Sequence, residues 1–241
     1  MTEPLLRVSG ISKRFGGLQA LSNVSLDANA GEIVGLIGPN GAGKTTLFSN
    51  LVGLHRPDSG SVRLQGKDLV GLKPHRIAAA GMVKTFQNVA LFLDSSVLDN
   101  VLTGGLMRRS VDGARDLARQ CLERVGISAI ADKLARDLSF PERARVEVAR
   151  ALCTEPRVLL LDEAMAALNH VEMDEFMALL RQLREEGLTL IIVEHHMRAI
   201  MSLCQRLVVL NFGQLIATGT PTEISRNPAV IEAYLGRSAA A

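Results

Sequence analysis

A glycine-rich loop between an apolar run and a helical pattern is the feature that most constrains this chain. The loop GPNGAGKTT matches G-x-x-x-x-G-K-[ST], follows the apolar run 33–37, and precedes apolar residues at helical spacing. Glycines let backbone N–H groups turn inward around phosphates, and the N-terminus of the next helix adds partial positive charge. Strand, loop and helix in this order predict a phosphate-binding unit rather than a chance glycine turn. The candidate phosphate-binding residues are Gly38, Pro39, Asn40, Gly41, Ala42, Gly43, Lys44, Thr45 and Thr46.

A second motif predicts a place for a metal ion beside the phosphates. The apolar run 158–161 ends in Asp162 and Glu163. Mg²⁺ takes oxygen ligands and keeps several waters, so Asp162 and the hydroxyl of Thr45 are its candidate ligands. Glu163 could orient or deprotonate an attacking water, and Lys44 could reach the β- and γ-phosphate oxygens. Alone, the acidic pair would indicate a solvated strand end; together with the glycine loop it indicates nucleotide hydrolysis.

Hydrophobic periodicity places these motifs in an α/β fold. A mostly parallel sheet is expected, because strands alternate with helices, and a block of helices interrupts the strands. Expected strands cover 6–8, 21–26, 33–37, 61–64, 82–86, 158–161, 188–193 and 207–210. Expected helices follow Pro74 and cover 97–106, 114–125, 143–152 and 171–186.

The composition excludes several classes of protein. The chain of 241 residues is 47% hydrophobic, yet no apolar run approaches the ~18–20 residues that a membrane-spanning helix needs. The first residues, MTEPLLRV, lack the basic and then apolar order of a signal peptide. Charges are nearly balanced at +2 without long blocks of one sign, so a nucleic-acid surface is not indicated. Three widely spaced cysteines without a CxxC pair argue against a disulfide framework or a zinc ribbon.

The motifs, taken in order, resemble those of ATP-binding subunits of ABC transporters. The resemblance rests on GPNGAGKTT, TFQ at 85–87, LLLDE at 159–163, a following ALN, and a histidine after a strand. The segments KRFGGLQAL, IIVEHHM and GTPTEISRNPAVIEAYLG are similar to ATPase subunits of branched-chain amino-acid importers and their relatives for urea and amides. The resemblance covers nearly the whole chain. It implies one ABC ATPase domain, 1–241, with a nucleotide-binding core at 1–87 and 155–241, an N-terminal antiparallel β part, and an inserted helical subdomain at 88–154.

The resemblance assigns further site residues. Phe15 matches the aromatic residue that stacks on adenine, although a core position is the alternative for a phenylalanine. Gln87 matches the residue that senses the γ-phosphate and Mg²⁺. His195 matches the switch histidine that contacts the γ-phosphate, with His196 as its rival. The cofactors implied are ATP and Mg²⁺.

The signature sequence of the family, Leu-Ser-Gly-Gly-Gln, is altered here to LSFPE at 138–142. Ser139 is retained and, with Glu142, still forms a helix capping box that Pro141 tolerates. In the family, the signature of one subunit completes the ATP site of the other. Pro141 offers no N–H to a phosphate, and Glu142 adds negative charge. We therefore expect an asymmetric heterodimer in preference to a homodimer, while symmetric function with FPE remains the alternative.

The resemblance implies an ATP-hydrolysing importer subunit at the cytoplasmic face of the plasma membrane. Its partners would be a second ATPase subunit, membrane permeases and, indirectly, an external solute-binding protein, without nucleic acid. The docking surface would lie within 88–102, where apolar side chains could equally pack in the core. A soluble ABC-type ATPase acting on a protein or nucleic-acid assembly is the alternative. A GTPase or small-molecule kinase is disfavoured, because the guanine motif N-K-x-D is missing from the sequence.

Overall fold

The computed structural model describes residues 3–85 and 90–235, and a six-stranded sheet forms the centre of this part. The strand order is β10-β9-β3-β8-β7-β6, and only β10 runs antiparallel to its neighbour. Every residue of β3, β7 and β8 is buried, because other elements cover both faces of the sheet. The strands are β3 (Ile33–Ile37), β6 (Met82–Lys84), β7 (Val158–Asp162), β8 (Thr189–Val193), β9 (Arg206–Asn211) and β10 (Gln214–Gly219).

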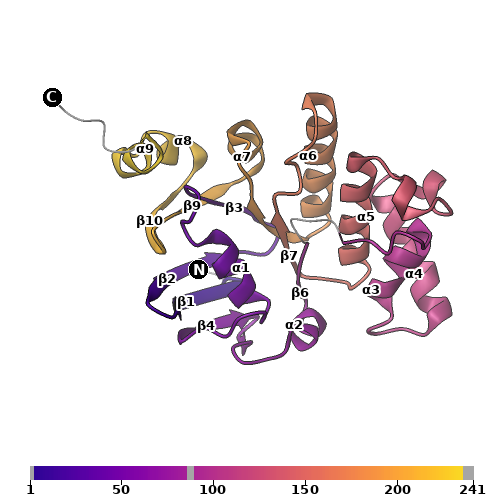
Figure 1. The fold of residues 1–241 in the computed structure, drawn as a ribbon, viewed down its shortest axis with the longest axis horizontal. Helices are drawn as coiled ribbons and strands as arrows, with labels where there is room; N and C mark the ends of the chain where they lie inside the picture. Colours follow the sequence, from indigo (N-terminus) through magenta and orange to yellow (C-terminus); the bar gives the residue numbers. More distant parts are fainter. Residues whose placement is uncertain (1–2, 86–89, 236–241) are drawn as a thin grey trace.

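A second sheet, antiparallel throughout, covers one face of the central sheet (Figure 1). Its order is β2-β1-β4-β5, and helix α1 lies between the two sheets. Phe48 of α1 is fully buried in a core that both sheets share. The elements of this layer are β1 (Leu6–Phe15), β2 (Leu18–Ala28), α1 (Lys44–Leu51), β4 (Ser59–Leu64) and β5 (Lys67–Asp68).

Helices form the opposite face and one end of the molecule. In Figure 1, α3, α4 and α5 stand together at the right, while α6 and α7 lie over the central sheet and α8 and α9 lie at the left. Gly104 lets α3 approach α5 closely, because a Cβ there would lie 2.3 Å from the carbonyl oxygen of Arg150. The helices are α2 (Pro74–Ala80), α3 (Val97–Gly105), α4 (Val111–Arg124), α5 (Phe140–Leu152), α6 (His170–Glu185), α7 (Met197–Leu203), α8 (Pro221–Ser225) and α9 (Pro228–Leu235), with 3-10 turns at Ser128–Ile130 and Ala135–Asp137.

The expected fold class is confirmed, with a mostly parallel sheet, an antiparallel β part and a helical block between β6 and β7. The expected strand 82–86 differs, since β6 ends at Lys84 and Phe86 lies outside the described residues. Strand β10 was not predicted, because its side chains are exposed or half-buried and show little apolar patterning. All three cysteines are buried and free. Within 3–85 and 90–235, none of the helices has the length and apolar character required to cross a bilayer.

Candidate nucleotide-binding site

The loop between β3 and α1 adopts a conformation that only glycine tolerates at two positions. Gly38 has φ +151°, and a Cβ there would lie 2.1 Å from the carbonyl oxygen of Leu210. Gly43, with φ +102°, caps the N-terminus of α1, and a Cβ would lie 2.8 Å from the carbonyl oxygen of Ala20. The two glycines thus let the loop turn tightly against neighbouring strands and place the N-terminus of α1 at a surface cavity.

Lys44 is held by the loop that precedes it. Its ammonium group donates hydrogen bonds to the carbonyl oxygens of Gly38, at 2.6 Å, and Pro39, at 3.0 Å. Burial lowers the pKa of Lys44 below its ordinary value, although the nearby carboxylates of Glu163 and Asp162 oppose that shift. To contact a phosphate, this ammonium group would exchange two carbonyl partners for phosphate oxygens.

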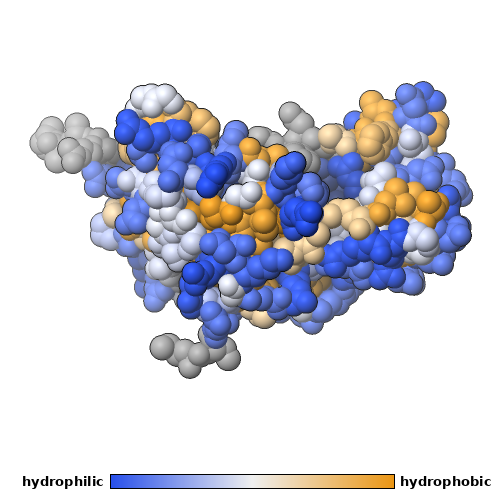
Figure 2. Space-filling model, turned by 90° about the horizontal axis from the view of Figure 1, so that it is seen from below, coloured by the Kyte–Doolittle hydropathy of each residue, from blue (hydrophilic) through white to orange (hydrophobic). Residues whose placement is uncertain are grey.

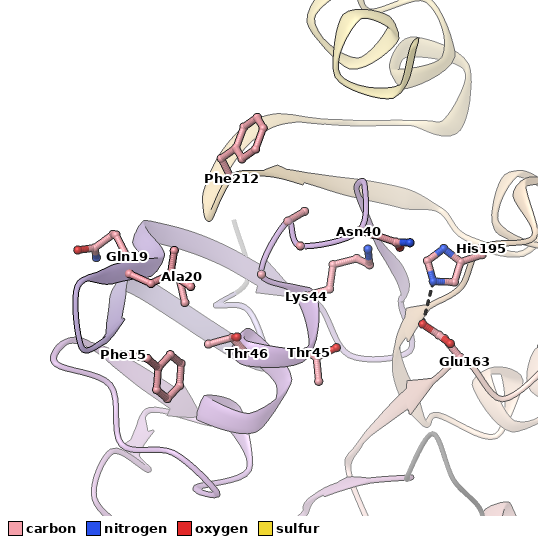
Figure 3. Close-up of a pocket in the computed structure, with 14 residues that line it drawn as sticks. Phe15, Gln19, Ala20, Asn40, Lys44, Thr45, Thr46, Glu163, His195 and Phe212 are labelled. Atoms are coloured by element: carbon pink, nitrogen blue, oxygen red, sulfur yellow. Dashed lines mark hydrogen bonds and ion pairs between the residues drawn. The ribbon is translucent and has the colours of Figure 1, made fainter. Parts of the chain in front are cut away.

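A cavity of about 470 Å³ opens over the glycine loop (Figure 3). Most of the predicted phosphate-binding residues line it, and Glu163 and His195 close one side. Gly38, Pro39 and Asp162 lie outside its lining, and Gln87 falls outside the described residues. The lining residues are Phe15, Leu18, Gln19, Ala20, Asn40, Gly41, Ala42, Gly43, Lys44, Thr45, Thr46, Glu163, His195 and Phe212.

Phe15 lies at the end of the cavity away from Glu163 (Figure 3). Phe15 is 42% exposed, so the alternative of a core phenylalanine is wrong. The ring contacts His55 edge-on, with 5.2 Å between ring centroids. An exposed aromatic ring at this place suits stacking on a flat base, which remains a prediction for Phe15.

Glu163 and His195 contact each other at one side of the cavity (Figure 3). His195 Nε2 lies 2.8 Å from Glu163 Oε1, and Figure 3 shows both side chains facing Lys44. Glu163 adopts a left-handed backbone conformation with φ +54°, and its N–H donates to the carbonyl oxygen of Val193 at 2.9 Å. Strain of this kind costs about 1–3 kcal/mol and gathers at functional sites. The rival His196 occupies the N-cap position of α7 and does not line the cavity.

Asp162 is buried behind the cavity at the end of β7, with 1% of its side chain exposed. Lys84 Nζ lies 2.8 Å from its Oδ2, whereas Oδ1 accepts no hydrogen bond from the described residues. A buried carboxylate oxygen without a donor suits a cation, and Thr45 offers a hydroxyl from the first turn of α1. These residues therefore fit Mg²⁺, which in nucleotide sites uses one or two protein ligands besides phosphate oxygens and waters.

The sequence analysis missed Glu194, which is buried at the end of β8. Its Oε1 accepts a hydrogen bond from the backbone N–H of Met165 at 2.7 Å, so it attaches the segment after Glu163 to β8. Burial, with added repulsion from Glu163 and Asp162, raises the pKa of Glu194 to about 7. Hydrogen bonds from the backbone N–H groups of Met165 and His195 act in the opposite direction. The sequence contains a signal for Glu194, because this residue directly follows an apolar run, as Asp162 does.

Ser139 lies outside the cavity, at the N-cap of α5 in the helical block. Glu142 Oε2 accepts hydrogen bonds from the N–H of Ser139 at 2.6 Å and from its hydroxyl at 2.8 Å. Lys133 Nζ lies 3.2 Å from the same carboxylate. Burial raises the pKa of Glu142, but the bonds from Ser139 and Lys133 outweigh burial and leave it below its ordinary value. The predicted capping box is thus present, and a carboxylate of this chain occupies the start of α5.

Comparisons with known proteins agree with these features. Residues 21–166 match the family model described as ABC transporter, and 214–240 match the model described as branched-chain amino acid ATP-binding cassette transporter. The high-affinity branched-chain amino acid transport ATP-binding protein BraF of Pseudomonas aeruginosa is 42% identical, covering 99% of this chain and 100% of BraF. LivG of Salmonella typhimurium, which has the same description, is 43% identical with the same coverage. The lipopolysaccharide export system ATP-binding protein LptB of Escherichia coli is 36% identical, covering 96% of this chain and 97% of LptB.

Solved structures agree as well. A nucleotide-free ATP-binding cassette from an ABC transporter superposes with a TM-score of 0.90 at 29% identity, covering 97% of this chain and 100% of the other. A dimeric ATP-binding cassette in a post-hydrolysis state, bound to ADP and Pi, superposes with a TM-score of 0.80 at 25% identity. The match covers 90% of this chain and 98% of the other. Fold, loop geometry and similarity over nearly the full length lead to one conclusion: this chain belongs to the ATP-binding subunits of ABC transporters and is a nucleotide-binding ATPase.

Proposed function

We propose that this chain powers an importer for a branched-chain or other hydrophobic amino acid, or for a related small polar solute such as urea or an amide. The observation that carries the proposal is 42–43% identity over the whole length to BraF and LivG. The match of 214–240 to the branched-chain model favours this branch over the lipopolysaccharide exporters, whose LptB is less similar.

The cavity supports a specific division of labour during ATP hydrolysis. Lys44 and the loop N–H groups would hold the phosphates, and Phe15 would stack on the base. Mg²⁺, held through Asp162, Thr45 and Gln87, would neutralise phosphate charge. Glu163 would accept a proton from the attacking water, and His195, 2.8 Å from Glu163, would keep that carboxylate oriented toward the γ-phosphate.

The partners proposed are a second ATPase subunit, integral-membrane permeases and, indirectly, an external solute-binding protein, so the chain would lie at the cytoplasmic face of the membrane. A heterodimer is favoured, because the carboxylate of Glu142 at the start of α5 would repel a phosphate of the partner's nucleotide. The partner subunit would then supply the intact signature for the cavity over Lys44. We further propose that residues 88–154 form one inserted subdomain and transmit closure to the permease.

Exposed apolar side chains on the helical block suit docking to a permease. Figure 2 shows apolar side chains gathered at the end of the molecule where this block lies. In the proposed docking segment, Leu91 is buried, whereas Phe92 is 58% and Leu93 48% exposed. The segment therefore combines a core contact with two side chains available to a partner, and Val89 lies outside the described residues.

Reconstitution of the importer tests the proposal. The chain, its candidate partner ATPase and the permeases would be placed in proteoliposomes with candidate solute-binding proteins, and ATP hydrolysis and solute uptake measured. We expect hydrolysis to rise with a hydrophobic amino acid, and Glu163→Gln to abolish both signals while ADP binding persists. Stimulation by no amino acid, amide or urea would contradict the importer branch. Purification without any integral-membrane protein would favour a soluble ABC-type ATPase.

A further inference from the structure

Lys84 forms a buried ion pair with Asp162, and the proposed chemistry gives this lysine no role. Lys84 Nζ lies 2.8 Å from Asp162 Oδ2, and the exposed fractions of the two side chains are 7% and 1%. Lys84 ends β6, which pairs in parallel with β7, the strand that ends at Asp162. Neighbouring strand ends therefore present the two charges to each other.

Negatively charged side chains surround this pair. Asp162, Glu163 and Glu194 bring three acidic groups to the ends of β7 and β8, and Asp162 and Glu163 both raise the pKa of Glu194. Glu163 and Asp162 also raise the pKa of Lys44 against the effect of burial, but Lys44 donates its hydrogen bonds to loop carbonyl oxygens. Lys84 also lies over the ring of Phe48, with Nζ 5.9 Å from the centroid. Its ammonium group is thus placed between a carboxylate and an aromatic face, where a buried cation is stabilised.

We propose that Lys84 is a positioning residue that neutralises and orients Asp162, and that Mg²⁺ binds in competition with this internal ammonium group. The inference rests on the metal site of the proposed function. With the ammonium group of Lys84 at Oδ2, Oδ1 would be the oxygen available to a metal ion, and the charge of Lys84 would repel a divalent ion. Metal binding is therefore weak until nucleotide phosphates add negative charge. Lys84 would thereby couple metal binding to nucleotide binding.

The metal-free protein tests the pair itself. Thermal unfolding of the full chain, in chelator and without nucleotide, would be compared for wild type, Lys84→Met, Asp162→Asn and the double variant, with exposed Lys67→Met as the matched control. We expect Lys84→Met to lower Tm by at least ~5 °C, because it leaves a buried carboxylate unpaired. When Asp162→Asn is already present, adding Lys84→Met should lower Tm by less than half of that amount. Equal losses in both backgrounds would overturn the pairing.

A Mg²⁺ titration tests the competition. ADP binding would be followed by calorimetry at rising Mg²⁺ in wild type, Lys84→Met and Lys67→Met. We expect the Mg²⁺ concentration for half-maximal enhancement of ADP affinity to fall about tenfold in Lys84→Met only, and an unchanged midpoint would overturn the inference. Lys84→Gln gives the same readouts should the methionine variant not fold. A wild-type ADP affinity that ignores Mg²⁺ would overturn the metal assignment and the competition with it, while the unfolding cycle would still decide the ion pair.

Discussion

At the residue scale, the charged side chains around the cavity differ in what holds them. Glu163 is held by a strained backbone and by His195, Asp162 by Lys84, and Glu194 by the N–H of Met165. Each carboxylate comes directly from the end of a buried parallel strand, which fixes its backbone. The role proposed for each carboxylate follows from the group that it contacts.

Replacing His195 tests the assignment of the switch histidine. We expect His195→Ala to lower kcat of the assembled complex by about 10²-fold, because the contact that orients Glu163 is lost. ADP affinity should stay within about twofold, since the loop and Lys44 are unchanged. His196→Ala is the matched control and should leave kcat within about twofold. Steady-state ATP hydrolysis separates the two, and an equal loss in both variants would contradict the assignment.

Glu194 predicts a dependence of stability on pH. Its pKa is raised from 4.5 to about 7 in the folded chain. The folded state therefore holds a proton that the unfolded state releases, and the free energy of unfolding falls as pH rises from about 4.5 to about 7. The slope is at most ~1.4 kcal/mol per pH unit. Urea unfolding at several pH values should show this slope in the difference between wild type and Glu194→Gln, whose amide does not titrate. Parallel curves for the two proteins would disprove the shift.

Sequence reasoning reached some of these residues and not others, for physical reasons. Gly38 and Lys44 were predictable, because a phosphate-binding turn restricts backbone conformation and residue type at fixed spacing. The pairing of Lys84 with Asp162 was not, since it depends on which strands become neighbours. Nothing local to residue 84 reveals that β6 lies beside β7.

At the scale of elements, the central strands were predicted well, because burial on both faces makes each one a continuous apolar run. Strand β10 was not predicted, because it is a partly exposed edge strand whose position depends on pairing with β9. The start of α5 was predicted from its capping box, a local motif whose partners are only three residues apart. The sequence thus predicts local motifs and strands that are buried on both faces, but it does not predict the pairing of an edge strand.

Restoring the family signature at the start of α5 tests what FPE does. We expect Phe140→Gly, Pro141→Gly and Glu142→Gln together to raise ATP hydrolysis of the assembled complex severalfold, because a negative charge leaves the helix start and the N–H that Pro141 lacks is restored. The same change should lower Tm by a few degrees, since two glycines enter the first turn of α5 and the bond from Ser139 to a charged carboxylate becomes a weaker bond to an amide. The single variant Phe140→Gly controls for bulk alone. A lower Tm without added activity would show that FPE already supports hydrolysis.

At the scale of the whole molecule, 47% hydrophobic residues are accommodated without any membrane-spanning helix in the described part of the chain. Two hydrophobic cores, one on each face of the central sheet, contain most of the apolar side chains. A smaller group stays exposed on the helical block and near the cavity, including Phe92, Phe140 and Phe212. Composition alone could not separate buried from exposed apolar residues, because that division follows from how the layers pack.

The last prediction concerns assembly. With Mg²⁺ and ATP, we expect the chain carrying Glu163→Gln to remain a monomer of 25.9 kDa, because a homodimer would place Glu142 against both nucleotides. Adding the partner ATPase should double the mass. Light scattering after size exclusion, at about 20 µM chain, measures this directly. Glu163→Gln combined with the restored Gly-Gly-Gln signature is the control and should dimerise alone. A homodimer that forms with FPE intact would refute the heterodimer and favour the symmetric alternative.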